Sequence, residues 1–146
     1  NLFARGFELT EITNKKIELI TCFEAFEHFI APTKELEKLL KTSRNILLST
    51  EFIPEPLPHP DQWWYYGAEH GQHIGFYQKD TFEYLADKFN LYFYTNGQNL
   101  HLLTEKRLPP SAFKWMSKFS KIITPLLKTR MKSLTIQDSE KIKASS

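Results

Sequence analysis

The chain has 146 residues, of which 41% are hydrophobic and 25% charged, as in an ordinary globular protein of one domain with a single sizeable core. Its one cysteine excludes a disulfide framework and a cysteine-based zinc site and fits a reducing, cytoplasmic compartment, and neither a membrane span nor a signal peptide is visible. The net charge of +2 conceals an asymmetry, because residues 1–105 carry 9 Lys and Arg against 15 Asp and Glu, whereas residues 106–146 carry 10 against 2.

The hydrophobic pattern of the first sixty residues predicts two strands around a helix. The run Ile17–Phe26 is rich in β-branched and aromatic residues, which predicts a buried strand covered on both faces, and Arg44–Ile53 predicts a second. Between them, residues 31–41 predict a helix with Thr33 as its N-cap. Four prolines within residues 54–60 exclude a helix or a central strand there.

The next elements complete an alternating pattern. Apolar residues spaced i, i+3, i+4 and i+7 predict an amphipathic helix over residues 79–90. Two strands follow, at residues 91–95 and 100–106, and the Asn96-Gly97 pair between them predicts a hairpin. This order predicts an α/β fold with a mainly parallel sheet that ends in an antiparallel hairpin.

The basic tail is a separate element. Residues 107–137 predict a basic amphipathic helical extension with an apolar stripe of Phe113, Met116, Phe119 and Ile122, which Pro125 ends or kinks, and residues 138–146 predict a frayed end. A membrane-surface helix and a nucleic-acid arm are alternatives for this extension. Packing on the acidic body is favoured by the opposed net charges of −6 and +8 that the counts above give.

Residues 63–77, WWYYGAEHGQHIGFY, gather aromatic rings, histidines and glycines. His70 and His73 invite a metal interpretation, but Gly71 and Gly75 disfavour the helix that their spacing needs, and no third ligand has suitable spacing, so we expect no metal. Nucleic-acid stacking needs a basic groove, and the stretch contains no Lys or Arg, so we expect no nucleic acid. A substrate pocket and a core aromatic cluster remain as alternatives.

Three stretches resemble the C-terminal half of class I S-adenosylmethionine-dependent methyltransferases. KIELITCFEAFEHF (residues 16–29) is similar to the family's fourth strand and its "EVLEH" loop, and RNILLSTEFI (residues 44–53) to its fifth strand. HGQHIGFYQKDTFEYLADKFNLYFYTNG (residues 70–97) is similar to the segment before the last helix and the closing hairpin. The resemblance covers about residues 7–106 and implies a partial Rossmann-like sheet, with residues 1–106 as the C-terminal portion of a methyltransferase-like domain.

The chain departs from the family in its first half. The glycine-rich loop after the first strand and the acidic residue that ends the second strand are absent, and residues 6–12 align with the third strand. The family's strand order, 3-2-1-4-5-7-6, would leave the fourth strand as an open apolar edge. We therefore expect the missing N-terminal half, or another chain, to cover that edge.

The resemblance also implies roles for particular residues. S-adenosylmethionine would be bound by Cys22, Phe23 and Glu24, at the carboxyl end of the fourth strand, and by Glu11 near the adenine. For Cys22 the alternative is a small buried hydrophobe, and for Glu27-His28 it is the favourable start of the following helix. His73, and then His70, are the candidates for a general base. The acceptor side would be lined by His28, Trp63, Trp64, Tyr65, Tyr66 and Tyr77.

The function that follows from the resemblance is methyl transfer from S-adenosylmethionine to O or N of a small-molecule or sugar-like acceptor. The alternative is a non-catalytic remnant that binds a partner through its open sheet edge or its basic tail. The sequence supports both, because the acceptor-like aromatic stretch is present and the glycine-rich loop is not.

Overall fold

The computed structural model describes residues 17–67, 69, 71, 73–128, 136, 139, 140 and 143. Ile17–Lys118 forms one compact unit, and the helix that follows belongs to another, so the two are described separately. The predicted strand at residues 6–12, Glu11 and His70 lie outside the described residues. In the described part of the chain, no helix has both the length and the apolar character that crossing a membrane requires.

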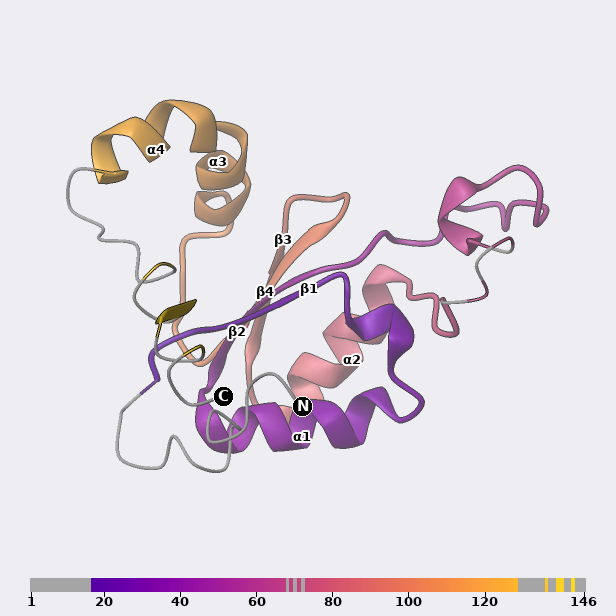
Figure 1. The fold of residues 1–146 in the computed structure, drawn as a ribbon, viewed down its shortest axis with the longest axis horizontal. Helices are drawn as coiled ribbons and strands as arrows, with labels where there is room; N and C mark the ends of the chain where they lie inside the picture. Colours follow the sequence, from indigo (N-terminus) through magenta and orange to yellow (C-terminus); the bar gives the residue numbers. More distant parts are fainter. Residues whose placement is uncertain are drawn as a thin grey trace. The chain divides into compact units, whose positions relative to one another are not determined.

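A four-stranded sheet forms the centre of the first unit (Figure 1). Its strands are β1 (Ile20–Phe23), β2 (Asn45–Ser49), β3 (Tyr92–Thr95) and β4 (Leu100–Thr104), in the order β1-β2-β4-β3. β1 runs parallel to β2, whereas β4 pairs antiparallel with both β2 and β3. Among the described strands, β1, β2 and β3 therefore run in one direction and β4 alone opposes them, as the prediction of a mainly parallel sheet with a closing antiparallel hairpin requires. Only the β1–β2 pair is parallel, because β4 lies between β2 and β3. The order itself is the 4-5-7-6 arrangement that the resemblance implies.

β1 is shorter and less buried than the sequence predicts. Of its four residues only Cys22 is buried, while Thr21 and Phe23 on the other face are exposed, Phe23 by 52%. Alternation of this kind marks a strand that packs on one face only. The prediction of cover on both faces is therefore wrong. Among the described residues β1 pairs only with β2, so it is an edge strand there.

Two helices, α1 (Pro32–Thr42) and α2 (Lys79–Phe89), lie on the same side of the sheet (Figure 1). Their apolar stripes and the inward residues of the strands form one core: Cys22, Phe26, Leu36, Leu40, Ile46, Leu48, Tyr77, Phe82, Leu85, Ala86, Leu91 and Leu103. The N-cap of α1 is Ala31 and makes no side-chain hydrogen bond, so the predicted cap at Thr33 is wrong. Pro32 explains the shift, because proline is favoured in the first turn of a helix.

The basic extension forms two helices, whereas its continuous apolar stripe predicts one amphipathic helix. α3 (Ala112–Lys118) lies against β3 and buries Phe113, while Met116 stays exposed. α4 (Ser120–Lys128), in the other unit, contains Pro125 and leaves Ile122 exposed. The break therefore falls at Phe119, and Pro125 does not end the helix in which it lies.

Candidate functional site

Glu24 follows β1 directly, at the carboxyl end of the parallel pair. Its backbone has φ +46°, a conformation that side-chain-bearing residues seldom adopt, and it is tied to the end of β2. The Glu24 N–H lies 3.2 Å from the carbonyl oxygen of Ser49 and 3.0 Å from its Oγ, and that hydroxyl donates to Glu24 Oε1 at 2.6 Å. The two strand ends thus hold an exposed carboxylate where open α/β sheets bind ligands.

The two residues before Glu24 diverge, because successive side chains of a strand point to opposite faces. Cys22 lies in the core, where burial, followed by the charge of Glu27, raises the pKa of its thiol to about 11. Phe23 lies on the open face. Of these three sequence-predicted cofactor residues, Glu24 alone presents polar side-chain atoms at the strand end.

Tyr65 joins this strand end to the aromatic loop. It lies in a 3-10 turn, Trp64–Tyr66, and is 1% exposed. Its hydroxyl donates to Glu24 Oε2 at 3.4 Å and lies 3.1 Å from Thr50 Oγ1, which can donate to it in turn. Burial is the main cause that raises the pKa of this phenol, so Tyr65 stays protonated and able to donate.

His73 lies on the other side of Tyr65. Its Nδ1 is 2.6 Å from the main-chain oxygen of Tyr65, and the two rings are 4.5 Å apart. A carbonyl oxygen can only accept, so Nδ1 carries the proton and the lone pair of the neutral ring lies on Nε2. His73 is half-buried, and Nε2 is the ring nitrogen that can act as a base or a ligand.

The backbone around His73 is fixed to the turn after β1. The N–H groups of Ile74 and Gly75 both donate to the carbonyl oxygen of Glu27, at 2.8 and 3.0 Å. Tyr77 donates its hydroxyl hydrogen to the carbonyl oxygen of Phe26 at 2.7 Å. A side chain at Gly75 would place its Cβ 2.6 Å from the Tyr77 hydroxyl oxygen, so the close approach requires glycine.

The remaining aromatic residues of the loop form a cluster beside Tyr65. The rings of Trp63, Tyr66 and Phe76 are 4.9 to 5.7 Å apart, and Tyr66 donates to the carbonyl oxygen of Pro58 at 3.0 Å. Trp64 is 76% exposed. Trp63 and Tyr66 thus support the loop, whereas Trp64 offers an uncovered ring to solvent. Tyr77, whose hydroxyl bonds internally, supports the loop as well.

Glu27 and His28 do not open the following helix, which corrects one interpretation of the sequence. They lie in a 3-10 turn, Phe26–His28, and α1 begins only at Pro32. Glu27 is completely buried, and neither carboxylate oxygen has a hydrogen-bond partner, although the Tyr65 phenol lies near enough for its pKa to respond to the charge. His28 is exposed, and its ring lies 5.0 Å from that of His73.

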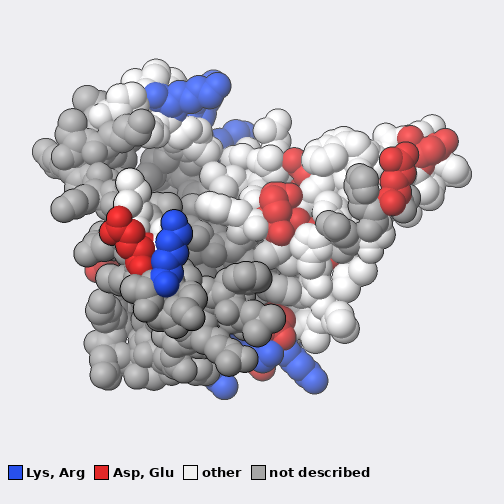
Figure 2. Space-filling view, viewed as in Figure 1, with Lys and Arg blue, Asp and Glu red and all other residues white. Residues whose placement is uncertain are grey.

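The surroundings of the site are acidic. Residues 51–78 contain Glu51, Glu55, Asp61 and Glu69 and no Lys or Arg. Figure 2 shows red side chains and no blue ones on the visible face of the segment between β2 and α2. Such a surface attracts cations and disfavours phosphorylated ligands.

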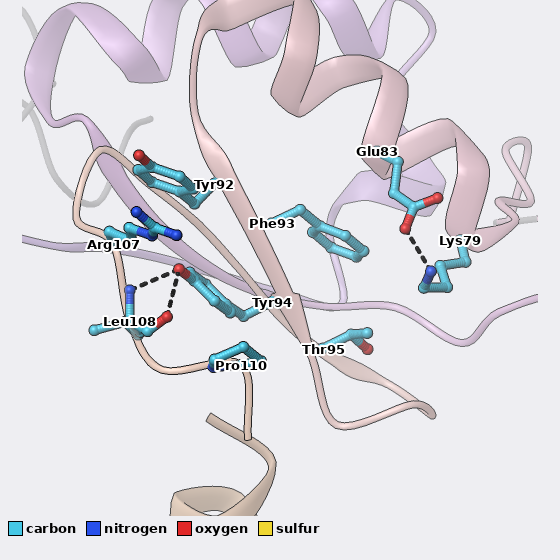
Figure 3. Close-up of a pocket in the computed structure, with 9 residues that line it drawn as sticks. All are labelled: Lys79, Glu83, Tyr92, Phe93, Tyr94, Thr95, Arg107, Leu108 and Pro110. Carbon is cyan, nitrogen blue, oxygen red and sulfur yellow. Dashed lines mark hydrogen bonds and ion pairs between the residues drawn. The ribbon is translucent and has the colours of Figure 1, made fainter. Parts of the chain in front are cut away.

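A separate pocket of about 450 Å³ lies along β3 (Figure 3). Tyr92, Phe93 and Tyr94 line it, with Arg107 at one end, and the Tyr94 hydroxyl bonds to both main-chain polar groups of Leu108. None of the sequence-predicted site residues lines this pocket. We therefore place the candidate site at the carboxyl ends of β1 and β2.

Sequence reasoning did not single out Ser49, Thr50 or the buried state of Glu27. The signal for the first two was available, since Ser49 ends an apolar strand and Thr50 follows it, in the same position at the carboxyl end as Glu24 has after β1. Glu27 carried no comparable signal, because its burial depends on the distant loop that covers it.

Comparison with known proteins places the chain within a family. A family model described as a methyltransferase domain matches residues 4–96, which is more than half of the chain. No curated protein and no solved structure shows significant similarity to it.

Proposed function

The chain belongs to the methyltransferase domain family, and from this premise we propose that it transfers a methyl group from S-adenosylmethionine to O or N of a small, uncharged, hydroxyl- or amine-bearing acceptor such as a sugar. The observation that carries the proposal is the chain of hydrogen bonds Glu24–Tyr65–His73, with contacts of 3.4 and 2.6 Å. It links a carboxylate at the end of β1 to a histidine in the aromatic loop. Donor and acceptor sides of one reaction would thus be held in fixed relation.

The residues at the strand ends fit the cofactor chemically. S-adenosylmethionine supplies, when bound, an electrophilic methyl group on a positively charged sulfur. The Glu24 carboxylate is the nearest charged group at the end of β1, and a carboxylate there stabilises the cofactor's positive charges. The Ser49 and Tyr65 hydroxyls hold that carboxylate in place.

His73 would perform the proton transfer. Its Nδ1–H is held by the Tyr65 carbonyl, so Nε2 presents a lone pair to the acceptor. The acceptor lone pair forms the new bond to the methyl carbon, the carbon–sulfur pair stays on sulfur, and the acceptor proton passes to Nε2. Positioning supplies most of the rate, since the methyl group is already activated.

The acceptor class follows from the loop's charge and aromatic character. No cationic side chain within residues 51–78 would neutralise a phosphate or carboxylate on the acceptor. The exposed ring of Trp64 offers a flat apolar surface against which a sugar ring can stack. An uncharged acceptor of modest size is therefore favoured.

The test is formation of S-adenosylhomocysteine by the purified chain, supplied with S-adenosylmethionine and a panel of hydroxyl- and amine-bearing sugars. The proposal predicts turnover with at least one uncharged acceptor and none with its phosphorylated counterpart. Turnover confined to anionic acceptors would contradict the acceptor class. Absence of turnover with every acceptor, together with absence of cofactor binding, would contradict the function.

A further inference from the structure

The spacing of His70 and His73 led us to expect no metal, but the fold brings two distant residues beside His73. We propose that Glu27, His28 and His73 form a binding site for a first-row divalent cation of the Zn²⁺ class. One ligand atom of each residue lies within 4.8 Å of the ligand atoms of the other two. The three residues come from two segments that the sequence separates by 44 positions, and the hydrogen bonds from Ile74 and Gly75 to the Glu27 carbonyl hold these segments together. The proximity is therefore built into the fold.

The buried carboxylate of Glu27 is a second, independent observation that points to a bound cation. The Glu27 side chain is completely buried, and among the described residues no donor stands in hydrogen-bonding geometry to either oxygen. The Tyr65 hydroxyl is close enough for Glu27 to contribute, after burial, to its raised pKa, but its hydrogen bonds go to Thr50 and Glu24. An ionised carboxylate without a partner is costly to bury, and buried charges are normally paired or bound to a metal. A cation between Glu27 and the two histidines would supply the missing partner.

The hydrogen bonding of His73 also fits a metal ligand. Histidines that bind metals usually donate their other ring N–H to a carboxylate or a backbone carbonyl, which fixes the tautomer. The Nδ1–H of His73 makes such a bond to the Tyr65 carbonyl, and the Nε2 lone pair is left for a cation. His28, exposed and 5.0 Å away ring to ring, can complete the set by side-chain rotation.

The donor set indicates the class of cation. Two imidazoles and one carboxylate suit Zn²⁺ and its first-row neighbours better than Mg²⁺ or Ca²⁺, which prefer oxygen ligands. Around Zn²⁺, ligand atoms at bonds of about 2.0–2.1 Å stand about 3.4 Å apart. The ligand atoms of the three residues are at most 4.8 Å apart, so small side-chain rotations would bring them to this spacing. A fourth coordination position would stay open.

A cation here would change how the proposed methyl transfer proceeds, and this part of the inference rests on the proposed function. With its Nε2 lone pair on the metal, His73 does not take up a proton. The cation instead binds the acceptor oxygen at its open position and lowers the pKa of that hydroxyl, whose proton passes to solvent water as the oxygen takes the methyl group. Cation binding itself needs neither cofactor nor acceptor, so it is tested alone.

The experiment is calorimetric titration of the chelator-treated chain with Zn²⁺, repeated with Co²⁺ while the visible absorption is recorded. We expect one equivalent per chain and Co²⁺ bands typical of low coordination. Loss of a residue that only orients a metal ligand weakens binding by up to about 100-fold. Glu27→Gln, His28→Ala and His73→Ala each remove a ligand, so each should weaken Zn²⁺ binding by more than that. His59→Ala is the matched control, because His59 is an exposed histidine paired with Asp61 outside the cluster, and it should bind as the unaltered chain does.

A second readout separates a metal ligand from a merely buried acid. In the metal-free state Glu27→Gln should raise Tm, because it removes a buried carboxylate that has no hydrogen-bond partner, yet Zn²⁺ should raise Tm in the unaltered chain and in His59→Ala and not in Glu27→Gln. Should Glu27→Gln fail to fold, the exposed His28→Ala variant carries the same binding test. Failure of the unaltered chain to bind Zn²⁺ or Co²⁺, or equal binding by all three variants, would overturn the site. Cofactor binding measured with chelator present would then still report on the proposed function separately.

Discussion

The Nδ1 atom of His73 donates a hydrogen bond to the main-chain carbonyl oxygen of Tyr65 at 2.6 Å. Because the acceptor is a backbone atom, the tautomer of His73 is set by the path of the loop and not by the Tyr65 hydroxyl. The Tyr65 hydroxyl in turn reaches Glu24 at 3.4 Å. Tyr65 thus fixes the position of His73, the proposed base, relative to the Glu24 carboxylate, which we propose binds the cofactor.

The first prediction concerns His73 as a base in the metal-free chain, and its rates are measured with a chelator present because a cation on Nε2 would occupy the same lone pair. In His73→Asn the side-chain amide can still donate to the Tyr65 carbonyl, but no lone pair remains at the position of Nε2. We expect methyl transfer to fall by about 10²–10⁴-fold, the usual contribution of a general base, with little change in cofactor affinity. Initial rates of S-adenosylhomocysteine formation and cofactor titration measure the two. His59→Asn is the matched control, and an equal loss of rate in both variants would remove the base role.

The charge of Glu24 is the subject of the second prediction. Glu24→Gln keeps the size of the side chain but removes its charge and one of the two oxygens that accept from Ser49 and Tyr65. We expect affinity for S-adenosylmethionine to fall about 10-fold, which corresponds to about 1.4 kcal/mol of lost electrostatic stabilisation. Glu55→Gln makes the same charge change on an exposed side chain that bonds Gln78. Calorimetric titrations that show equal affinity for both variants would exclude Glu24 from the cofactor site.

A third prediction tests the close approach at Gly75. The Cβ of Gly75→Ala would stand 2.6 Å from the Tyr77 hydroxyl oxygen, and that oxygen is held by its bond to the Phe26 carbonyl. We expect a loss of about 1–3 kcal/mol in the free energy of unfolding, as for other overpacking changes. Tyr77→Phe alone should cost about 1 kcal/mol for the lost hydrogen bond.

The double variant Gly75→Ala, Tyr77→Phe distinguishes this clash from a general intolerance of alanine. Removing the hydroxyl gives the new methyl group room, so the double variant should be more stable than the sum of the two single losses predicts. Urea unfolding of the four proteins measures the coupling. Strict additivity would show that Gly75 is required for another reason.

The fourth prediction concerns pH and His101, a buried residue of β4 outside the candidate site. Its Nε2–H donates to the Thr50 carbonyl at 2.9 Å, and its Nδ1 lies 2.8 Å from the Thr95 hydroxyl. Burial lowers the pKa of His101 from 6.5 to about 4. Between these values the unfolded chain binds the proton and the folded chain does not, so stability is complete above pH 6.5 and declines as the pH falls toward 4.

The expected size of this effect follows from the shift. A shift of about 2.5 pKa units corresponds to about 3 kcal/mol, most of which is lost by pH 4.5. In His101→Gln the free energy of unfolding should be lower at pH 7 but should decline less between pH 7 and pH 4.5. Urea unfolding at the two pH values measures both proteins. The same decline in the variant would assign the pH dependence to the carboxylates alone.

Local pattern was enough to predict most of the elements. The i, i+3, i+4, i+7 spacing of Phe82, Leu85, Ala86 and Phe89 placed α2 correctly, and Asn96-Gly97 placed the hairpin between β3 and β4. Such signals depend on neighbours within a few residues. The depth of burial of β1 was mispredicted, because it depends on which elements cover each face, and a run of apolar letters does not encode that.

In the candidate site, too, the features that depend on neighbouring residues were predicted and those that depend on distant residues were not. The position of Glu24 after a strand was readable from the sequence, since strand ends are local features. The role of Tyr65 depends on Thr50 and Glu24, which lie 15 and 41 residues away, so no spacing rule reveals it. Glu27 was misassigned for a related reason. Its burial depends on a loop more than forty residues away, whereas the helix predicted over the nearby residues 31–41 suggested that Glu27 stands at a helix start.

Calorimetric titration of the chain with S-adenosylmethionine, in the presence of a chelator, measures whether the carboxyl ends of β1 and β2 bind the cofactor. We expect saturable binding at one equivalent per chain, weakened by Glu24→Gln and unchanged by Glu55→Gln. Absence of any binding heat up to millimolar cofactor, or binding that Glu24→Gln and Glu55→Gln leave equally intact, would contradict a cofactor site at the carboxyl ends of β1 and β2.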